Sequence, residues 1–384
     1  MNAKDILGLI PDELFDFLSL ETKVDYQVKK LTGESVFKLI LFSMLDSDKL
    51  SLRVMERFLE SSKFKCFVDN ADLSVKYNSI RDRICTINTD YFARLFESIF
   101  QIYNRELQEE QALSKADSTY VSTASKLLSI GMRNGSSNDA KGFIKYSINL
   151  KGSLPSSVKV FTDQSAASDN IALSELLEQA GCLTDNIVVF DRGLSSRKSY
   201  DTLTQANKFF VTRGNPTVRF ELVEQREVPL ASTQSSVIII DDFVGSLFSR
   251  QSSKTQYTYR IIKAQIVASG QEIVFISNLL NEDAYFIAEL YRQRWEIELF
   301  FKFIKQHLNA THLVSRTENG IKVMLYVTMI LAMLIIVYKK KNEITSFKIA
   351  KLKFSIELEN EIIKEIVLLC GGNPEKAIHL FGYD

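Results

Sequence analysis

The chain has 384 residues, of which 46% are hydrophobic and 24% charged, with 47 basic and 47 acidic side chains and three histidines. This length predicts two or three domains, and the composition leaves little room for long disordered tails. The balanced charge does not by itself indicate a polyanion ligand. The four cysteines form no CxxC pair, which excludes a zinc ribbon and suits a reducing, cytoplasmic setting. The N-terminus is too acidic to predict a secretory signal.

One uncharged apolar run, residues 323–338, raises the possibility of a membrane anchor. A bilayer crossing needs about 20 apolar residues, and this run is shorter, with no second span to pack against. A helix buried on all sides in a large domain gives the same pattern. We therefore expect a buried helix and no membrane, with an integral membrane protein as the alternative.

Residues 1–110 are predicted to be helical, because apolar positions recur at spacings of three and four. Ser51 and Asp90 are predicted N-caps. Lys76, Arg81 and Arg83 could line a helix face that contacts DNA phosphates, or a solvated face with no ligand. The predicted helices are 35–45, 51–60, 75–84 and 91–107.

From residue 113 the pattern changes to short strands, predicted at 116–123, 142–150 and 157–163. Helices at 172–180 and 197–205 then alternate with strands at 186–190 and 208–212, which is typical of parallel strands with helical crossovers. Further β pattern follows, and a long helix is predicted to begin near Asp283. The expected fold class is α/β: a mixed sheet flanked by helices and interrupted by a β-rich insertion at about 216–278.

The predicted helix after Asp283 carries four polar side chains on one side. Tyr291, Arg294, Glu298 and Lys305 fall in a stripe about 60° wide at 100° per residue. The stripe could line a cleft, or it could be only the solvated face of an amphipathic helix. Glu296 lies on another side, so it is not expected to reach the same ligands.

This stripe has the spacing Y-x2-R-x3-E-x6-K, which closely resembles the signature of bacterial insertion-sequence transposases of the Asp-Asp-Glu (DDE) type. The segments ADST around Asp117 and VVFDRG around Asp191 resemble those that carry the two catalytic aspartates of that group. The resemblance implies a ribonuclease H-like catalytic domain over 111–384, preceded by a helical DNA-binding region over 1–110.

The resemblance makes Asp117, Asp191 and Glu298 the expected catalytic and metal-binding residues. Three carboxylates brought together repel one another, at roughly 4 kcal/mol for two charges about 4 Å apart at an effective dielectric near 20. Oxygen ligands of this kind suit Mg²⁺ or Mn²⁺. Two such ions can activate a nucleophile and stabilise the leaving 3′ oxygen, so two ions per site are expected.

Double-stranded DNA is the expected partner, both the terminal inverted repeats of the element and the target. The resemblance implies that Tyr291, Arg294 and Lys305 hold phosphates, and Arg213 is a further candidate DNA contact. It also implies a homodimer on the DNA ends, in a cytoplasmic, nucleoid-associated protein.

Several residues keep a second interpretation. Trp295, the only tryptophan, is expected in the core, with a base-stacking platform as the alternative. Asp163, Asp241 and Asp242 could be surface or turn carboxylates. An inactivated relative that binds DNA without cutting it, or a nuclease that hydrolyses but never joins strands, remains an alternative function.

Overall fold

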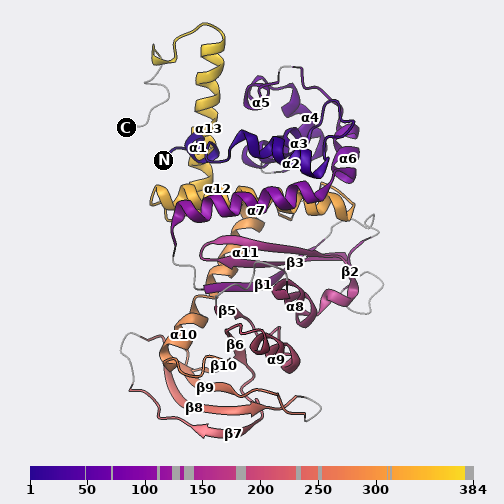
Figure 1. Ribbon diagram of the computed structural model, residues 1–384. Coiled ribbons are helices and arrows are strands. Elements are labelled where there is room, and N and C mark those ends of the chain that lie inside the picture. Colours follow the sequence, from indigo (N-terminus) through magenta and orange to yellow (C-terminus); the bar gives the residue numbers. More distant parts are fainter. Residues whose placement is uncertain are drawn as a thin grey trace.

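A computed structural model describes residues 1–47, 49–70, 72–109, 113–122, 130–133, 142–178, 187–230, 235–249, 253–308, 310–311 and 314–376. Helices at the N- and C-terminal ends of the chain form one end of the molecule, and the sheet and its β-rich extension form the other (Figure 1). Several predicted features lie outside the described residues: the ends of the predicted strand 116–123 and helix 172–180, and the start of the predicted strand 186–190. The same holds for Cys182 and His312.

The described elements before the first strand are helices. Four of them correspond to the predicted ones, and α1, α2 and α5 have no predicted counterpart. Their bounds are α1 Ala3–Leu7, α2 Asp12–Thr22, α3 Gly33–Asp46, α4 Leu52–Glu60, α5 Ser62–Phe67, α6 Tyr77–Thr86 and α7 Thr89–Leu107.

The two predicted N-caps belong to α4 and α7. Ser51 accepts a hydrogen bond from the Val54 amide at 3.3 Å, so the predicted N-cap is confirmed. The predicted cap at Asp90 is wrong. Asn88 caps α7 instead, and Asp90 lies in the first turn, where its negative charge favours the positive end of the helix dipole.

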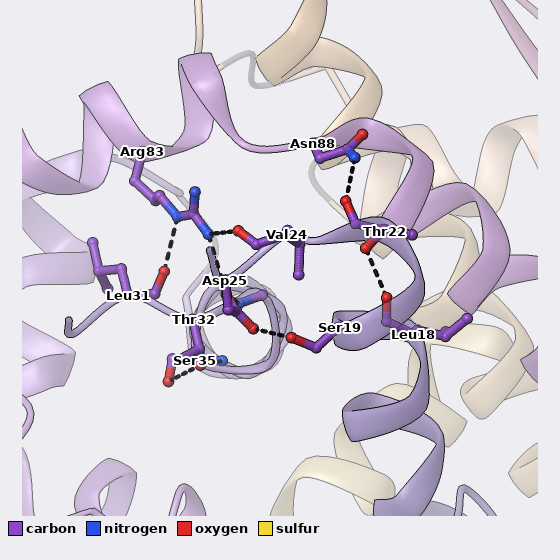
Figure 2. A network of polar contacts seen from close by, with 11 residues as sticks. Leu18, Ser19, Thr22, Val24, Asp25, Leu31, Thr32, Ser35, Arg83 and Asn88 are labelled. Atoms are coloured by element: carbon purple, nitrogen blue, oxygen red, sulfur yellow. Dashed lines mark hydrogen bonds and ion pairs between the residues drawn. The ribbon is translucent and has the colours of Figure 1, made fainter. Parts of the chain in front are cut away.

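Arg83 is a structural residue of the helical part and not a free phosphate ligand (Figure 2). Its guanidinium donates hydrogen bonds to the carbonyls of Leu31 and Val24 at 2.8 Å each, and it pairs with Asp25 at 3.2 Å. These bonds tie α6 to the segment between α2 and α3. The neighbouring cations are paired at the surface, Arg81 with Asp82 and Lys76 with Glu56.

The long apolar helix α12, Glu318–Lys341, lies inside the protein. It is long and apolar enough to cross a membrane, but 89% of its most hydrophobic window is buried within the fold. Helices α7 and α13 (Phe347–Leu369) pack against it, as does the sheet through β4. The predicted buried helix is therefore confirmed, and the helix needs no lipid to cover its apolar side chains.

In the described part of the chain the strands form one mixed sheet in the order β2-β3-β1-β5-β6-β10-β9-β8-β7, with β4 also paired to β3. Strand β1 is antiparallel to β3 and parallel to β5, and β5 is parallel to β6. The bounds are β1 Leu113–Ser122, β2 Met132–Arg133, β3 Gly142–Lys151, β4 Leu154–Phe161, β5 Ile187–Phe190, β6 Phe210–Gly214, β7 Phe220–Gln225, β8 Val237–Leu247, β9 Tyr259–Ile266 and β10 Glu272–Ser277.

Strands β7 to β10, from the predicted insertion, continue this sheet. Strand β10 pairs antiparallel with β6, and β9, β8 and β7 follow outward. Two crossover helices, α8 Asp169–Glu178 and α9 Arg197–Gln205, connect β4, β5 and β6, and a short 3₁₀ helix, η1 Gln164–Ala167, precedes α8. The chain then leaves the sheet through α10 Ala284–Arg292 and α11 Trp295–His307 and returns to the helical end (Figure 1).

Candidate active site

Three carboxylates that are far apart in the sequence are brought to one place by the sheet and by α11. Ala116 of β1 lies opposite Phe190 at the end of β5, so Asp117, the next residue of β1, and Asp191, the first residue after β5, lie at the same level of the sheet. Glu298 is in the first turn of α11, which packs against β1. The negative charge of Asp191 also contributes to raising the pKa of Asp117.

Arg294 and Tyr291 connect these carboxylates. The Arg294 guanidinium donates through Nη1 to Asp117 at 3.3 Å and through Nη2 to Glu298, and the Tyr291 hydroxyl donates to Asp191 at 3.2 Å. The guanidinium also lies 5.6 Å from the centre of the Tyr291 ring. The Arg294 Nε atom is buried and has no hydrogen-bond partner among the described residues. One cation and one hydroxyl thus contact all three acids.

Asp117 has a strongly altered acidity. Burial raises its pKa to about 6, the Ser118 amide and Arg294 lower it, and the charges of Asp191 and Asp169 raise it. The Ser118 amide donates to Asp117 Oδ1 at 2.7 Å. A carboxylate that is costly to ionise in its own environment gains most from a bound positive charge. A raised carboxylate pKa of this kind is typical of a functional site, including one where the carboxylate binds a cation.

The single helix predicted after Asp283 is two helices, because α10 ends at Arg292 and α11 begins at Trp295. At the junction the amides of Arg294 and Ile297 bond to carbonyls three residues earlier, so the backbone tightens without leaving the helical region. Tyr291, Arg294 and Glu298 therefore still lie on one side of the two helices, as predicted. Each of them contacts the site, as a common helix face requires.

The other two predicted DNA ligands are not among the contacts of the three acids. Lys305 follows Glu298 by two turns on α11, and burial lowers its pKa. Arg213 is near the end of β6, one residue beyond the pair Phe190–Thr212. It therefore lies at the end of the parallel strands where Asp191 follows β5. Neither side chain has a hydrogen bond or ion pair with another described residue, and both are partly exposed. Both positive charges are available to an anion.

The expected core position of Trp295 is wrong, because 58% of its surface is exposed. It starts α11 directly after Arg294, so packing of α11 on β1 does not cover it. Glu296 is likewise more than a solvated residue. It pairs at 2.8 Å with Lys115, a side chain only 4% exposed that lies two residues before Asp117 on β1. The pair ties α11 to the strand that carries the first aspartate.

One of the predicted surface carboxylates is also different. Asp242 is 1% exposed and forms a bidentate ion pair with Arg260 at 2.5 and 2.7 Å. Asp241 has the predicted exposure and lies 3.5 Å from Lys263. Neither lies among the contacts of Asp117, Asp191 and Glu298.

The sequence interpretation missed a group of residues around the loop after Asp191. Lys145, Asp169 and Asn170 contact that loop or its support. The adjacent Asp and Asn at a predicted helix start were a usable local signal. Nothing in the sequence connected them to a lysine on another strand.

The donor set of this site fits a hard divalent cation, because carboxylate oxygens are what such ions bind. Within the described residues, however, no group of three or more His, Cys, Asp or Glu side chains is arranged to hold a metal ion. Arg294 and Tyr291 take the carboxylate oxygens. A cation here requires Asp117 and Glu298 to turn from Arg294 toward each other.

Three sequences named as transposases are similar to this chain. A protein named as transposase y4zB of Sinorhizobium fredii is 31% identical over 41% of this chain and 44% of its own length. The sequence named for insertion sequence element IS5377 of Geobacillus stearothermophilus is 28% identical over 67% of this chain and 68% of its own. The one named for element IS4SA of Synechocystis is 27% identical over 60% of each. The chain thus spans between 44% and 68% of these relatives.

Among solved structures, a piggyBac transposase synaptic complex with hairpin DNA matches with a TM-score of 0.47 and 11% identity, over 95% of this chain and 82% of that one. The family model described as the transposase DDE domain matches residues 116–334, more than half of the chain, and this range contains Asp117, Asp191 and Glu298. The chain belongs to the family of DDE-type insertion-sequence transposases.

Proposed function

We propose that this protein cleaves phosphodiester bonds at the ends of an insertion sequence and joins the 3′ ends to target DNA, with two divalent cations in the site. The observation that carries the proposal is the convergence of Asp117, Asp191 and Glu298 from two parallel strands and one helix. Family membership supplies the reaction class, and the altered pKa of Asp117 supports a cation-dependent role.

The three carboxylates Asp117, Asp191 and Glu298 would hold the two ions, Mg²⁺ or Mn²⁺. When bound, two such ions activate the attacking oxygen and stabilise the leaving one. The protein's own part is to keep the three acids on a rigid sheet and helix. The same arrangement would serve water in cleavage and a 3′-hydroxyl in joining.

Tyr291, Arg294, Lys305 and Arg213 would hold DNA phosphates beside the carboxylates. Arg294 can grip a phosphate with two N–H groups, whereas Lys305 acts as a point charge. Arg294 would have to leave Asp117 and Glu298 to do so, and its unpartnered Nε gives it a further donor. The exposed ring of Trp295 would stack on an unpaired base next to the site.

The core of the sheet supports a ribonuclease H-like catalytic domain. The order β4-β3-β1-β5-β6 has three antiparallel strands followed by two that run parallel to β1. We further propose that the protein acts on double-stranded DNA as a homodimer, that residues 1–110 contribute to DNA binding, and that it works in the cytoplasm.

One rival function is DNA binding without cleavage, as in an inactivated relative. The other is a hydrolytic nuclease that does not join strands. The second would need the carboxylates but not the phosphate-binding set of Tyr291, Arg294 and Lys305. Both differ from the proposal in what they do to DNA ends, so one assay separates them.

The test is cleavage and strand joining of DNA that carries the sequences flanking the gene, in Mg²⁺, by wild type and by Glu298→Gln. We expect the substitution to reduce cleavage by at least about a thousandfold, because it removes a charged cation ligand while keeping the shape of the side chain. The matched control is Glu289→Gln, on the exposed side of α10, where Glu289 pairs only with Arg292 among the described acids and bases.

The control should cleave at the wild-type rate. Wild type that binds these ends but never cuts them in Mg²⁺ or Mn²⁺ would favour the DNA-binding alternative. Cleavage without joining would favour the nuclease. Equal activity of Glu298→Gln and wild type would remove Glu298 from the site.

A further inference from the structure

The loop that carries Asp191 is held from one side by the start of α8. The Asn170 side-chain oxygen accepts hydrogen bonds from the amides of Ser195 and Ser196 at 2.8 and 2.9 Å. Two adjacent loop amides therefore share one acceptor. Because Ser195 is four residues beyond Asp191, these bonds fix where the loop goes after it leaves β5.

Asp169 contacts the same loop closer to Asp191. A Cβ atom on Gly193 would lie 2.8 Å from Asp169 Oδ2 and 2.9 Å from Asp169 Cβ. The loop thus passes so close to α8 that residue 193 has no space for a side chain. Gly193 is needed here for close approach, since any larger residue would push Asp191 and its loop away from α8.

The start of α8 is itself fixed to the sheet by Lys145. This lysine is fully buried on β3 and donates to Asp169 Oδ1 at 2.8 Å and to the Ala167 carbonyl at 2.6 Å. The Tyr120 hydroxyl, from the strand that carries Asp117, donates to the same carbonyl at 3.0 Å. A buried charge with two fitted acceptors resists movement, because any displacement leaves it unpaired.

These contacts form a continuous connection from β1 and β3 through α8 to the loop after β5. We infer that Lys145, Asp169 and Asn170 are positioning residues, which set the place of Asp191 relative to Asp117 without touching the substrate. The inference rests on the proposed function, since it assumes that these aspartates share bound cations. Residues that hydrogen-bond to metal ligands or support them, without binding the metal, typically weaken metal affinity by about 10- to 100-fold when they are removed.

The test compares Asn170→Ala, which loses the oxygen, with Asn170→Asp, which keeps it. Two readouts are measured: the Mg²⁺ concentration that gives half-maximal cleavage, and Tb³⁺ binding to the DNA-free protein, detected by luminescence excited through Trp295, the only tryptophan. We expect Asn170→Ala to weaken both by about tenfold or more, and Asn170→Asp to stay within about threefold of wild type.

A second variant changes the other contact of the loop, between Gly193 and Asp169. Gly193→Ala puts a methyl group against Asp169 and should weaken Tb³⁺ binding in the same direction as Asn170→Ala. The control is Asn70→Ala, which removes a similar contact, to the Asp72 amide at 3.1 Å, from an exposed turn of the N-terminal part. Thermal unfolding of each variant separates loss of fold from loss of position.

If wild type binds Tb³⁺ and cleaves DNA while Asn170→Ala and Gly193→Ala match it in both readouts, the inference is overturned and the proposed function stands. Equal weakening by Asn170→Ala and Asn170→Asp would also overturn it, because the retained oxygen would then have no effect. A wild type that neither binds Tb³⁺ nor cleaves overturns both, since no cation site is left to position.

Discussion

At the residue scale, Asp117 shows how burial and charge oppose each other in this site. Its side chain is 21% exposed, and desolvation outweighs the attraction of Arg294, so the pKa rises to about 6. The folded protein therefore holds a proton on Asp117 at pH values where the unfolded chain has released it. Stability gained from this protonated acid is complete below the ordinary pKa and is lost as the pH rises through about 6.

The first prediction concerns this linkage in protein kept free of divalent cations with EDTA. Asp117→Asn removes the ionisation, so it should unfold with a free energy close to that of wild type at pH 4 and about 3 kcal/mol higher at pH 7.5, at 1.36 kcal/mol per pKa unit. Urea unfolding at both pH values measures this difference. A difference that is the same at both pH values would mean that the pKa of Asp117 is not raised.

The Asp241–Asp242 pair shows that neighbouring residues of one type can have unlike roles. They alternate across β8, so one faces the solvent side and the other is buried against Arg260. Arg260 also donates to the carbonyls of Leu280 and Glu282 at 3.1 and 2.5 Å, in the segment that leads into α10. The buried pair thus joins the outer sheet to the start of α10, which leads to Arg294 and Glu298.

A second prediction follows for these two carboxylates. Asp242→Asn should lower the free energy of unfolding by about 3 kcal/mol, because it leaves the Arg260 charge buried without its counterion. Asp241→Asn, the matched neighbour, should cost less than about 1 kcal/mol, since its pair with Lys263 is partly exposed. Equal costs in denaturant unfolding would contradict the assignment of the buried pair.

At the scale of elements, the junction between α10 and α11 matters most. A few 3₁₀-type bonds tighten the backbone after Arg292 while keeping the side-chain stripe that faces the sheet. The Lys115–Glu296 pair then fixes the first turn of α11 on β1. Glu296 is therefore a poor neutral control for Glu298, which is why Glu289 on α10 is the better one.

At the scale of the whole molecule, the N- and C-terminal helices share one core. Buried residues of α3, α6 and α7 pack in the same cluster as those of α12 and α13, together with side chains of β3 and β4. In space, α12 and α13 thus belong with the helical end, although the division at residue 110 would put them in the catalytic domain (Figure 1). That division remains a prediction.

The last prediction tests whether residues 1–110 fold by themselves. Because α7 buries its apolar face against α12, a fragment of residues 1–110 should lack a cooperative thermal transition by circular dichroism, while the full chain shows one. The full chain at the same concentration is the control. A cooperative transition in the fragment would establish the helical region as an independent domain.

The sequence alone determined much of this protein, because its strongest signals are local. Hydrophobic period predicted the main helices, the strand that carries Asp117 and the strand that precedes Asp191. The spacing of Tyr291, Arg294 and Glu298 predicted their common face, which the break in the helix preserves. The motifs around the three acids were sufficient to recognise the family.

Only the tertiary structure decided how single side chains are used. Arg83 is a half-buried ion-pair partner, Asp242 is a buried one and Trp295 is exposed, and each outcome depends on which distant segment covers the residue. The same holds for Lys145, which supports Asp191 through Asp169 although neither is near it in sequence. Local periodicity fixes which face a residue occupies, but burial and pairing arise from contacts between segments far apart in the chain.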